Sequence, residues 1–210
     1  MKYIFIGDVH GKTTECLVPL LARRGQDANY ILQVGDMGLG FQGVNLPPQP
    51  ACFGFIRGNH DNPGLCQSHS NYAGEYGPWN GVFVVGGAFS IDWQWRVPGK
   101  SWWFGEELSA EEGQKAYEAY AKQKPRIVAT HDCPQEIGEQ LLRDGGFRPE
   151  KWGSTESRTA KLLQAMWDIH KPEYWVFGHY HRSWTIDIRG TKFRCLNELE
   201  VAQLEVKDVE

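Results

Sequence analysis

Residues 3–11 read Tyr-Ile-Phe-Ile-Gly-Asp-Val-His-Gly, and the pattern in this stretch decides the fold. Its four apolar residues, ended by a glycine, predict a short buried strand that an Asp and a His follow directly. Apolar runs at 30–34 and 53–56 end in the same way, before Gly-Asp and before Arg-Gly-Asn-His. Functional loops of α/β proteins lie at the carboxyl ends of strands, so we expect these three loops at one edge of a sheet.

The rest of the chain alternates between strand and helix patterns. Further strands are expected at 82–85, 88–91, 126–130 and 174–177, and helices at 12–24, 109–122, 134–143 and 156–169. Ser109 and Glu112 predict a capping box at the start of one helix. Residues 37–50 and 61–80 are expected to be loops, whereas 184–206 alternates apolar and polar residues as antiparallel strands do. No repeat or linker is present, so we expect one domain over all 210 residues.

The composition is that of a globular protein, with 41% hydrophobic and 23% charged residues, which excludes a disordered, collagen-like or coiled-coil chain. A net charge of −4 without a basic stripe gives no signature of a nucleic-acid partner. The five cysteines are spread out with no Cys-x-x-Cys pair, which is typical of the reducing cytoplasm. No stretch approaches the about 18 apolar residues of a membrane span, so we expect a cytoplasmic protein without a membrane partner.

Five of the seven histidines follow expected strands and stand beside Gly, Asp or Asn. The blocks are Gly7-Asp8-Val9-His10-Gly11, Gly35-Asp36, Gly58-Asn59-His60-Asp61, His131 and Gly178-His179-Tyr180-His181. Imidazole nitrogens together with carboxylate oxygens suit borderline divalent metals such as Mn, Fe, Co or Zn. The adjacent glycines allow close backbone approach. One such block alone is more often a turn, but five in order predict a metal site.

The ordered blocks resemble the calcineurin-like metallophosphoesterase superfamily, whose pattern is D-x-H, G-D, G-N-H-D/E, H and G-H-x-H. The resemblance spans most of the chain, from Asp8 to His181. It implies an α/β fold, a four-layer sandwich of two mixed β-sheets flanked by helices, with a dinuclear metal site on the strand ends. Carried over by position, Asp8, His10 and His181 bind the first metal, Asn59, His131 and His179 bind the second, and Asp36 bridges both.

The resemblance also implies an activity, the metal-dependent hydrolysis of phosphate esters, either diesters or monoesters. The nucleophile is a hydroxide that bridges the two ions, which are Mn in the first place and Fe, Zn, Co or Ni as alternatives. His60 protonates the leaving oxygen as general acid, and Asp61 orients the His60 ring. The expected substrate is a small phosphate ester, with nucleotides among the candidates.

Two alternatives to this activity remain open. Protein phosphatases of the superfamily extend the second block to G-D-x-V-D-R-G, whereas residues 35–40 here read Gly-Asp-Met-Gly-Leu-Gly. The phosphate-binding Arg of a Ser/Thr protein phosphatase is therefore missing at that position. A non-catalytic scaffold on the same fold is disfavoured because every motif block is retained.

Residues 79–104 contain five of the nine tryptophans and form the most individual segment. Trp102 and Trp103 are candidates to stack on a substrate, and Arg96 is a candidate to bind its phosphate. The alternative, which we favour for the tryptophans, is that they only close the core. Arg57 and Arg182 also flank motif blocks, and for them a salt bridge is the expected role.

Overall fold

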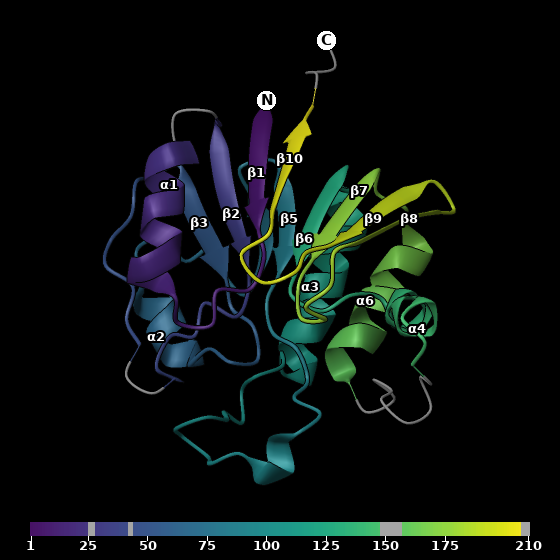
Figure 1. Cartoon of the computed structure of the whole chain (residues 1–210). Helices are drawn as coiled ribbons and strands as arrows, with labels where there is room; N and C mark the ends of the chain where they lie inside the picture. Colours follow the sequence, from purple (N-terminus) through teal and green to yellow (C-terminus); the bar gives the residue numbers. More distant parts are fainter. Residues whose placement is uncertain (25–27, 42–43, 148–156, 207–210) are drawn as a thin grey trace.

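The structure is a computed structural model that describes residues 1–24, 28–41, 44–147 and 157–206. Within these residues two β-sheets pack face to face, and helices cover their outer sides (Figure 1). The strand order is β10-β1-β2-β3 in the first sheet and β4-β5-β6-β7-β9-β8 in the second. This is the predicted four-layer α/β sandwich, so the fold class is confirmed. None of the described helices is long and apolar enough to cross a membrane.

Both sheets are mixed. The first contains β1 (Lys2–Ile6), β2 (Tyr30–Val34), β3 (Phe53–Ile56) and β10 (Val201–Glu205). The second contains β4 (Tyr76–Trp79), β5 (Val82–Val85), β6 (Ile127–Thr130), β7 (Tyr174–Phe177), β8 (Trp184–Ile188) and β9 (Thr191–Cys195). Strands β1–β3 run parallel, as do β5, β6, β7 and β9, whereas β10, β4 and β8 pair antiparallel with their neighbours. The segment 184–206, expected to form antiparallel strands, is therefore shared between the two sheets. Its strands β8 and β9 lie in the second sheet, whereas β10 lies in the first.

The helices that the sequence predicts begin and end close to the expected positions. A π-helical turn, Thr13–Leu17, continues into α1 (Val18–Arg24), and α2 (Pro63–Ser68), α3 (Ala110–Gln123), α4 (Gln135–Asp144) and α6 (Arg158–Ile169) follow. The capping box that opens α3 is present as predicted. For the helix expected from Glu156, the first described helical residue is Arg158, and Glu156 itself lies outside the described residues.

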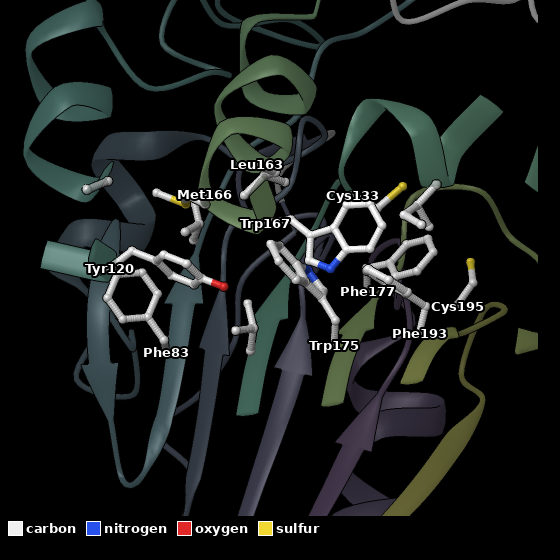
Figure 2. Packing of buried hydrophobic residues seen from close by; sticks show 14 of the residues in the cluster. Phe83, Tyr120, Cys133, Leu163, Met166, Trp167, Trp175, Phe177, Phe193 and Cys195 are labelled. Atoms are coloured by element: carbon white, nitrogen blue, oxygen red, sulfur yellow. The ribbon is translucent and has the colours of Figure 1, made fainter. Parts of the chain in front are cut away.

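The period-two alternation of the strands builds the layers. In β1, Tyr3 and Phe5 pack in a cluster between the sheets, whereas Ile4 and Ile6 pack with Leu17 on the outer side. A third cluster joins the second sheet to α3, α4 and α6 (Figure 2). Its buried tryptophans keep their N–H donors paired, since Trp167 donates to Thr191 and Trp175 donates to Thr130.

Two expectations for residues 61–91 were wrong. Residues 88–91 are not a strand, and β5 instead forms a hairpin with β4 through Asn80-Gly81, at φ values of 45° and 86°. An Asn-Gly turn with two positive φ values matches strand twist, and Pro78 is tolerated because β4 is an edge strand. The expected loop 61–80 also contains α2. Asn62 caps this helix by accepting hydrogen bonds from two backbone N–H groups.

Candidate metal centre

The expected metal ligands follow five parallel strands, three in one sheet and two in the other. Asp8 and His10 follow β1, Asp36 follows β2, Asn59 follows β3, His131 follows β6, and His179 and His181 follow β7. The carboxyl ends of these strands meet, and the structure brings all seven side chains into two adjoining groups that share Asp36.

The first group consists of Asp8, His10, Asp36 and His181. One nitrogen or oxygen atom from each of the four lies within 4.8 Å of the others. The Nε2 atoms of His10 and His181 are 2.8 Å apart, and His181 Nε2 is 3.1 Å from Asp8 Oδ2. Donor atoms at this spacing could surround one divalent ion.

The second group lies on the other side of Asp36. Asp36 Oδ1 is 3.3 Å from His131 Nε2, which is in turn 3.2 Å from Asn59 Oδ1. The rings of His131 and His179 meet edge to face at 5.1 Å between centroids. Asp36 Oδ2 points to the first group and lies 3.8 Å from His10 Nε2. The two carboxylate oxygens of Asp36 therefore face different groups, as a bridging ligand requires.

The backbone at this centre is held in unusual conformations. Positive φ values occur at His10 (47°), Asp36 (57°), His179 (67°) and His181 (49°). Such values are uncommon outside glycine and cluster at functional sites. The expected close approach at the glycines is also present, since a Cβ on Gly58 would lie 2.1 Å from Asp36 Oδ1. No sequence pattern indicated the four strained residues.

Charge and burial shift the pKa values of several of these side chains and so decide which of them can bind a metal without first losing a proton. Burial opposes the charge of Asp36, but the attraction of His131 holds the pKa of Asp36 well below its usual range. The same attraction outweighs burial at His131 and raises its pKa to about 10. Burial, aided by the nearby His131, lowers the pKa of His179 to about 3. Near neutral pH, Asp36 and His179 therefore have their metal-binding forms, whereas His131 must first release a proton.

His60 lies beside the centre with its Nε2 atom 3.9 Å from Asp36 Oδ2. Arg96 reaches it from the long segment between β5 and α3, and Arg96 Nη2 is 3.0 Å from His60 Nε2. Burial first, and then the charge of Arg96, lowers the pKa of His60 even though Asp36 opposes the shift. Arg96 also forms an ion pair of 2.7 Å with Asp92.

Asp61 does not have the expected contact with the ring of His60. Its carboxylate accepts hydrogen bonds of 2.6–3.2 Å from the backbone N–H groups of Met37, Gly38, Leu39 and Gly58. Four donors occupy both oxygens of this buried side chain, so Asp61 ties the loop after β2 to the loop after β3. The orienting role expected for Asp61 is corrected accordingly.

A cavity of about 360 Å³ adjoins the centre. Arg96 and His60 line it together with Phe89, Ile91, Leu142 and Tyr180, which add an apolar wall that the sequence did not reveal. Trp102 and Trp103 are not among the described lining residues; Trp102 packs against Trp93 and Phe104 instead. Sequence spacing could not indicate this wall, since its members come from separate parts of the chain.

The other residues discussed from the sequence have structural contacts. Buried Arg57 donates to Glu75 at 2.6 Å, and Arg182 lies over the ring of Phe147. The two histidines outside the motif blocks, His69 and His170, each contact a backbone carbonyl oxygen.

Comparisons with known proteins identify the family and support the fold. The sequence profile of calcineurin-like phosphoesterases matches residues 1–183. No curated protein matches the sequence significantly. A solved structure from Staphylococcus aureus, described as a candidate 5′-nucleotidase in complex with α-ketoglutarate, has a TM-score of 0.52 and 15% identity. That match covers 96% of this chain and 50% of the other, so the chain spans about half the length of that protein.

A second solved structure, described as a predicted phosphoesterase from Streptococcus pneumoniae, has a TM-score of 0.43 and 8% identity. The match covers 98% of this chain and 84% of the other. At such identities the similarity concerns the fold alone.

Proposed function

The chain belongs to the calcineurin-like phosphoesterase family, and from this premise we propose that it hydrolyses small phosphate esters with two divalent metal ions. The proposal rests on one observation, that two groups of nitrogen and oxygen donors share the carboxylate of Asp36. Asp8, His10 and His181 hold the first ion with Asp36, and Asn59, His131 and His179 hold the second with the same residue. When bound, such a pair of ions supplies an acidified water and neutralises charge on the phosphoryl group.

The chain's own residues then bind and protonate the substrate. We assign to Arg96 the binding of a phosphate oxygen, because its guanidinium lies beside the centre, 3.0 Å from His60. Arg96 thereby takes the role of the Arg that the second motif block lacks. His60 donates the proton to the leaving oxygen, as its place at the edge of the centre allows.

The cavity favours a compact substrate. About 360 Å³ is at the lower end of the volumes of small-molecule sites. The apolar wall of Phe89, Ile91 and Leu142 is suited to the organic part of an ester, while Arg96 faces its charged part. A small organic phosphate, nucleotides included, is therefore the proposed substrate, and Mn²⁺ is the first metal to test.

We also propose a cytoplasmic location. All five cysteines are unpaired in the structure, and three of them are buried. Free thiols of this kind are typical of reducing compartments.

The direct test measures hydrolysis of p-nitrophenyl phosphate and bis-p-nitrophenyl phosphate by metal-free protein, before and after addition of Mn²⁺. Hydrolysis of at least one ester should appear only after the metal is added. A phosphoserine peptide is the third substrate, and its hydrolysis would indicate the activity of a protein phosphatase. If the Mn²⁺-loaded protein hydrolyses none of the three, the proposal is wrong and a scaffold role stands instead.

A further inference from the structure

Asn59 is the only amide among the proposed ligands, and an amide can bind a metal through one of its two ends only. Its oxygen has lone pairs, whereas its NH₂ group presents hydrogens. The side chain is almost fully buried, with Oδ1 3.2 Å from His131 Nε2. The opposite end donates from Nδ2 to Ser90 Oγ at 3.0 Å. The orientation of the Asn59 amide therefore depends on whether the Ser90 hydroxyl oxygen accepts this hydrogen bond.

The direction of this hydrogen bond is set by Glu106, the next residue in the hydrogen-bonded chain. The Ser90 hydroxyl donates its single hydrogen to Glu106 Oε2 at 2.5 Å. The backbone N–H of Ser90 donates to the other carboxylate oxygen, Oε1, at 2.9 Å. Because the hydroxyl hydrogen is used toward Glu106, Ser90 Oγ can only accept from Asn59. The chain of donors runs in one direction, from Asn59 through Ser90 to Glu106.

Glu106 is itself anchored close to the third motif block. Its backbone oxygen accepts a hydrogen bond of 2.6 Å from Arg57 Nη1. Arg57 also receives a 2.7 Å hydrogen bond from the N–H of Gly87 on its own backbone oxygen. Ser90 and Glu106 are both buried, with 1% and 4% of their surface exposed. The segment 86–106 is thus tied to the residues that immediately precede Asn59.

We infer that Ser90 and Glu106 are positioning residues that turn the carbonyl oxygen of Asn59 toward the metal centre. The inference rests on the proposed function, since it takes Asn59 to be a ligand of the second ion. A flipped amide would direct two N–H donors at a cation and remove one ligand from that ion. Groups that orient a ligand in this way commonly change metal affinity by about 10–100-fold when they are altered. Neither residue belongs to any of the five motif blocks.

The test compares Glu106→Gln, Ser90→Ala and Ser90→Thr with the wild-type protein by calorimetric titration with Mn²⁺. In Glu106→Gln an amide N–H can donate to Ser90, so the Ser90 hydrogen is free to turn toward Asn59. We expect affinity for one of the two ions to fall by about 10–100-fold in Glu106→Gln and Ser90→Ala, while the other ion binds as in the wild type. Ser90→Thr keeps the hydroxyl and should retain both affinities. Ser101→Ala, which removes a hydroxyl elsewhere in the same segment, is the matched control.

A second measurement needs no metal. In the metal-free protein, the Nδ2 protons of Asn59 should exchange slowly with solvent, and Ser90→Ala should accelerate this exchange. A wild-type protein that binds fewer than two ions contradicts the proposed function, and the role toward the metal fails with it. If the wild type binds two ions but Glu106→Gln and Ser90→Ala bind both unchanged, only the positioning role is wrong. A loss of both ions together with a lower melting temperature also contradicts positioning, because it shows a general structural role.

Discussion

At the scale of single residues, Asp36 lies between the two groups of the proposed centre. Its Oδ1 atom accepts a 2.8 Å hydrogen bond from the backbone N–H of His60 and lies 3.3 Å from His131 Nε2. Its Oδ2 atom faces His10 and His60 at 3.8 and 3.9 Å. The buried carboxylate is thus surrounded by groups from both halves of the proposed centre.

Asp36→Asn should therefore lose more bound metal and more activity than a change of one outer ligand such as His181→Ala. The amide keeps the size of the side chain but removes the charge and one of the two binding oxygens. Elemental analysis after dialysis against Mn²⁺ gives the metal content, and ester hydrolysis gives the activity. Two full equivalents of metal in Asp36→Asn, with activity kept, would contradict the bridging assignment.

His60→Ala tests the general acid. Both ions should stay bound, and kcat should fall by a factor on the order of 10²–10⁴ for esters with a poor leaving group. An alkyl or ribose alkoxide needs a proton to depart, whereas p-nitrophenolate needs it far less. The ratio of the two rate losses is the measurement. Equal losses for aryl and alkyl esters, or the loss of an ion, would show that His60 is a ligand or a structural residue.

At the scale of elements, the long segment between β5 and α3 has more than one role. It lies at the end of the molecule opposite the N-terminus (Figure 1). Part of it is apolar packing, with Trp103 buried and Trp102 in contact with Phe104 at 4.6 Å between ring centroids. The same segment also contains Arg96, whose guanidinium group contacts the ring of His60. The segment therefore combines apolar packing with a charged residue at the site.

Trp103→Ala should destabilise the fold without changing which esters are preferred. Truncating a buried Trp costs about 3–5 kcal/mol of unfolding free energy, because contacts are lost and a cavity remains. Urea denaturation measures the loss, and relative KM values for aryl, nucleotide and aliphatic esters measure the preference. Trp95→Ala is the control, since Trp95 is 81% exposed and its loss should change stability by less than about 0.5 kcal/mol. A selective rise of KM for nucleotides would indicate stacking on the substrate.

At the scale of the whole molecule, the centre connects the two sheets. Asp8, His10, Asp36 and Asn59 follow strands of the first sheet, and His131, His179 and His181 follow strands of the second. Ions held by these residues, as proposed, would be bound by both sheets at once. Because the seven residues come together only in the folded chain, the ions should bind the native state in preference to the unfolded state.

Mn²⁺ should accordingly raise the melting temperature, by an amount that corresponds to about 2.7 kcal/mol when free metal is at about 100 times Kd. The pKa of His131 is raised to about 10 in the metal-free protein, so its proton competes with the metal at neutral pH. Raising the pH from about 6.5 to 8.5 lowers the proton concentration and so weakens this competition, and the stabilisation by Mn²⁺ should therefore increase with pH. Thermal scans with Mn²⁺ and with chelator check this, and Asp36→Asn should show a smaller shift. A stabilisation that falls with rising pH would contradict the coupling to His131.

The sequence by itself determined most of the strands and indicated the location of the candidate site. The strands at Tyr30–Val34, Phe53–Ile56, Val82–Val85 and Tyr174–Phe177 have the predicted limits, because a short apolar run ended by glycine is a local signal. The fold class followed from the resemblance to the calcineurin-like superfamily, and the meeting of the motif blocks followed from the rule that functional loops lie at the carboxyl ends of strands. These features depend on neighbours in the chain and on the order of the elements.

Only the tertiary structure decided which side chains meet within the site. The contact between Arg96 and His60 and the path from Asn59 through Ser90 to Glu106 join residues that are tens of positions apart. Asp61 bonds to backbone N–H groups rather than to the imidazole beside it in sequence, because the loop after β2 folds over its carboxylate. Such contacts depend on loop paths and rotamers that long-range packing selects, and no local pattern of residue types encodes them.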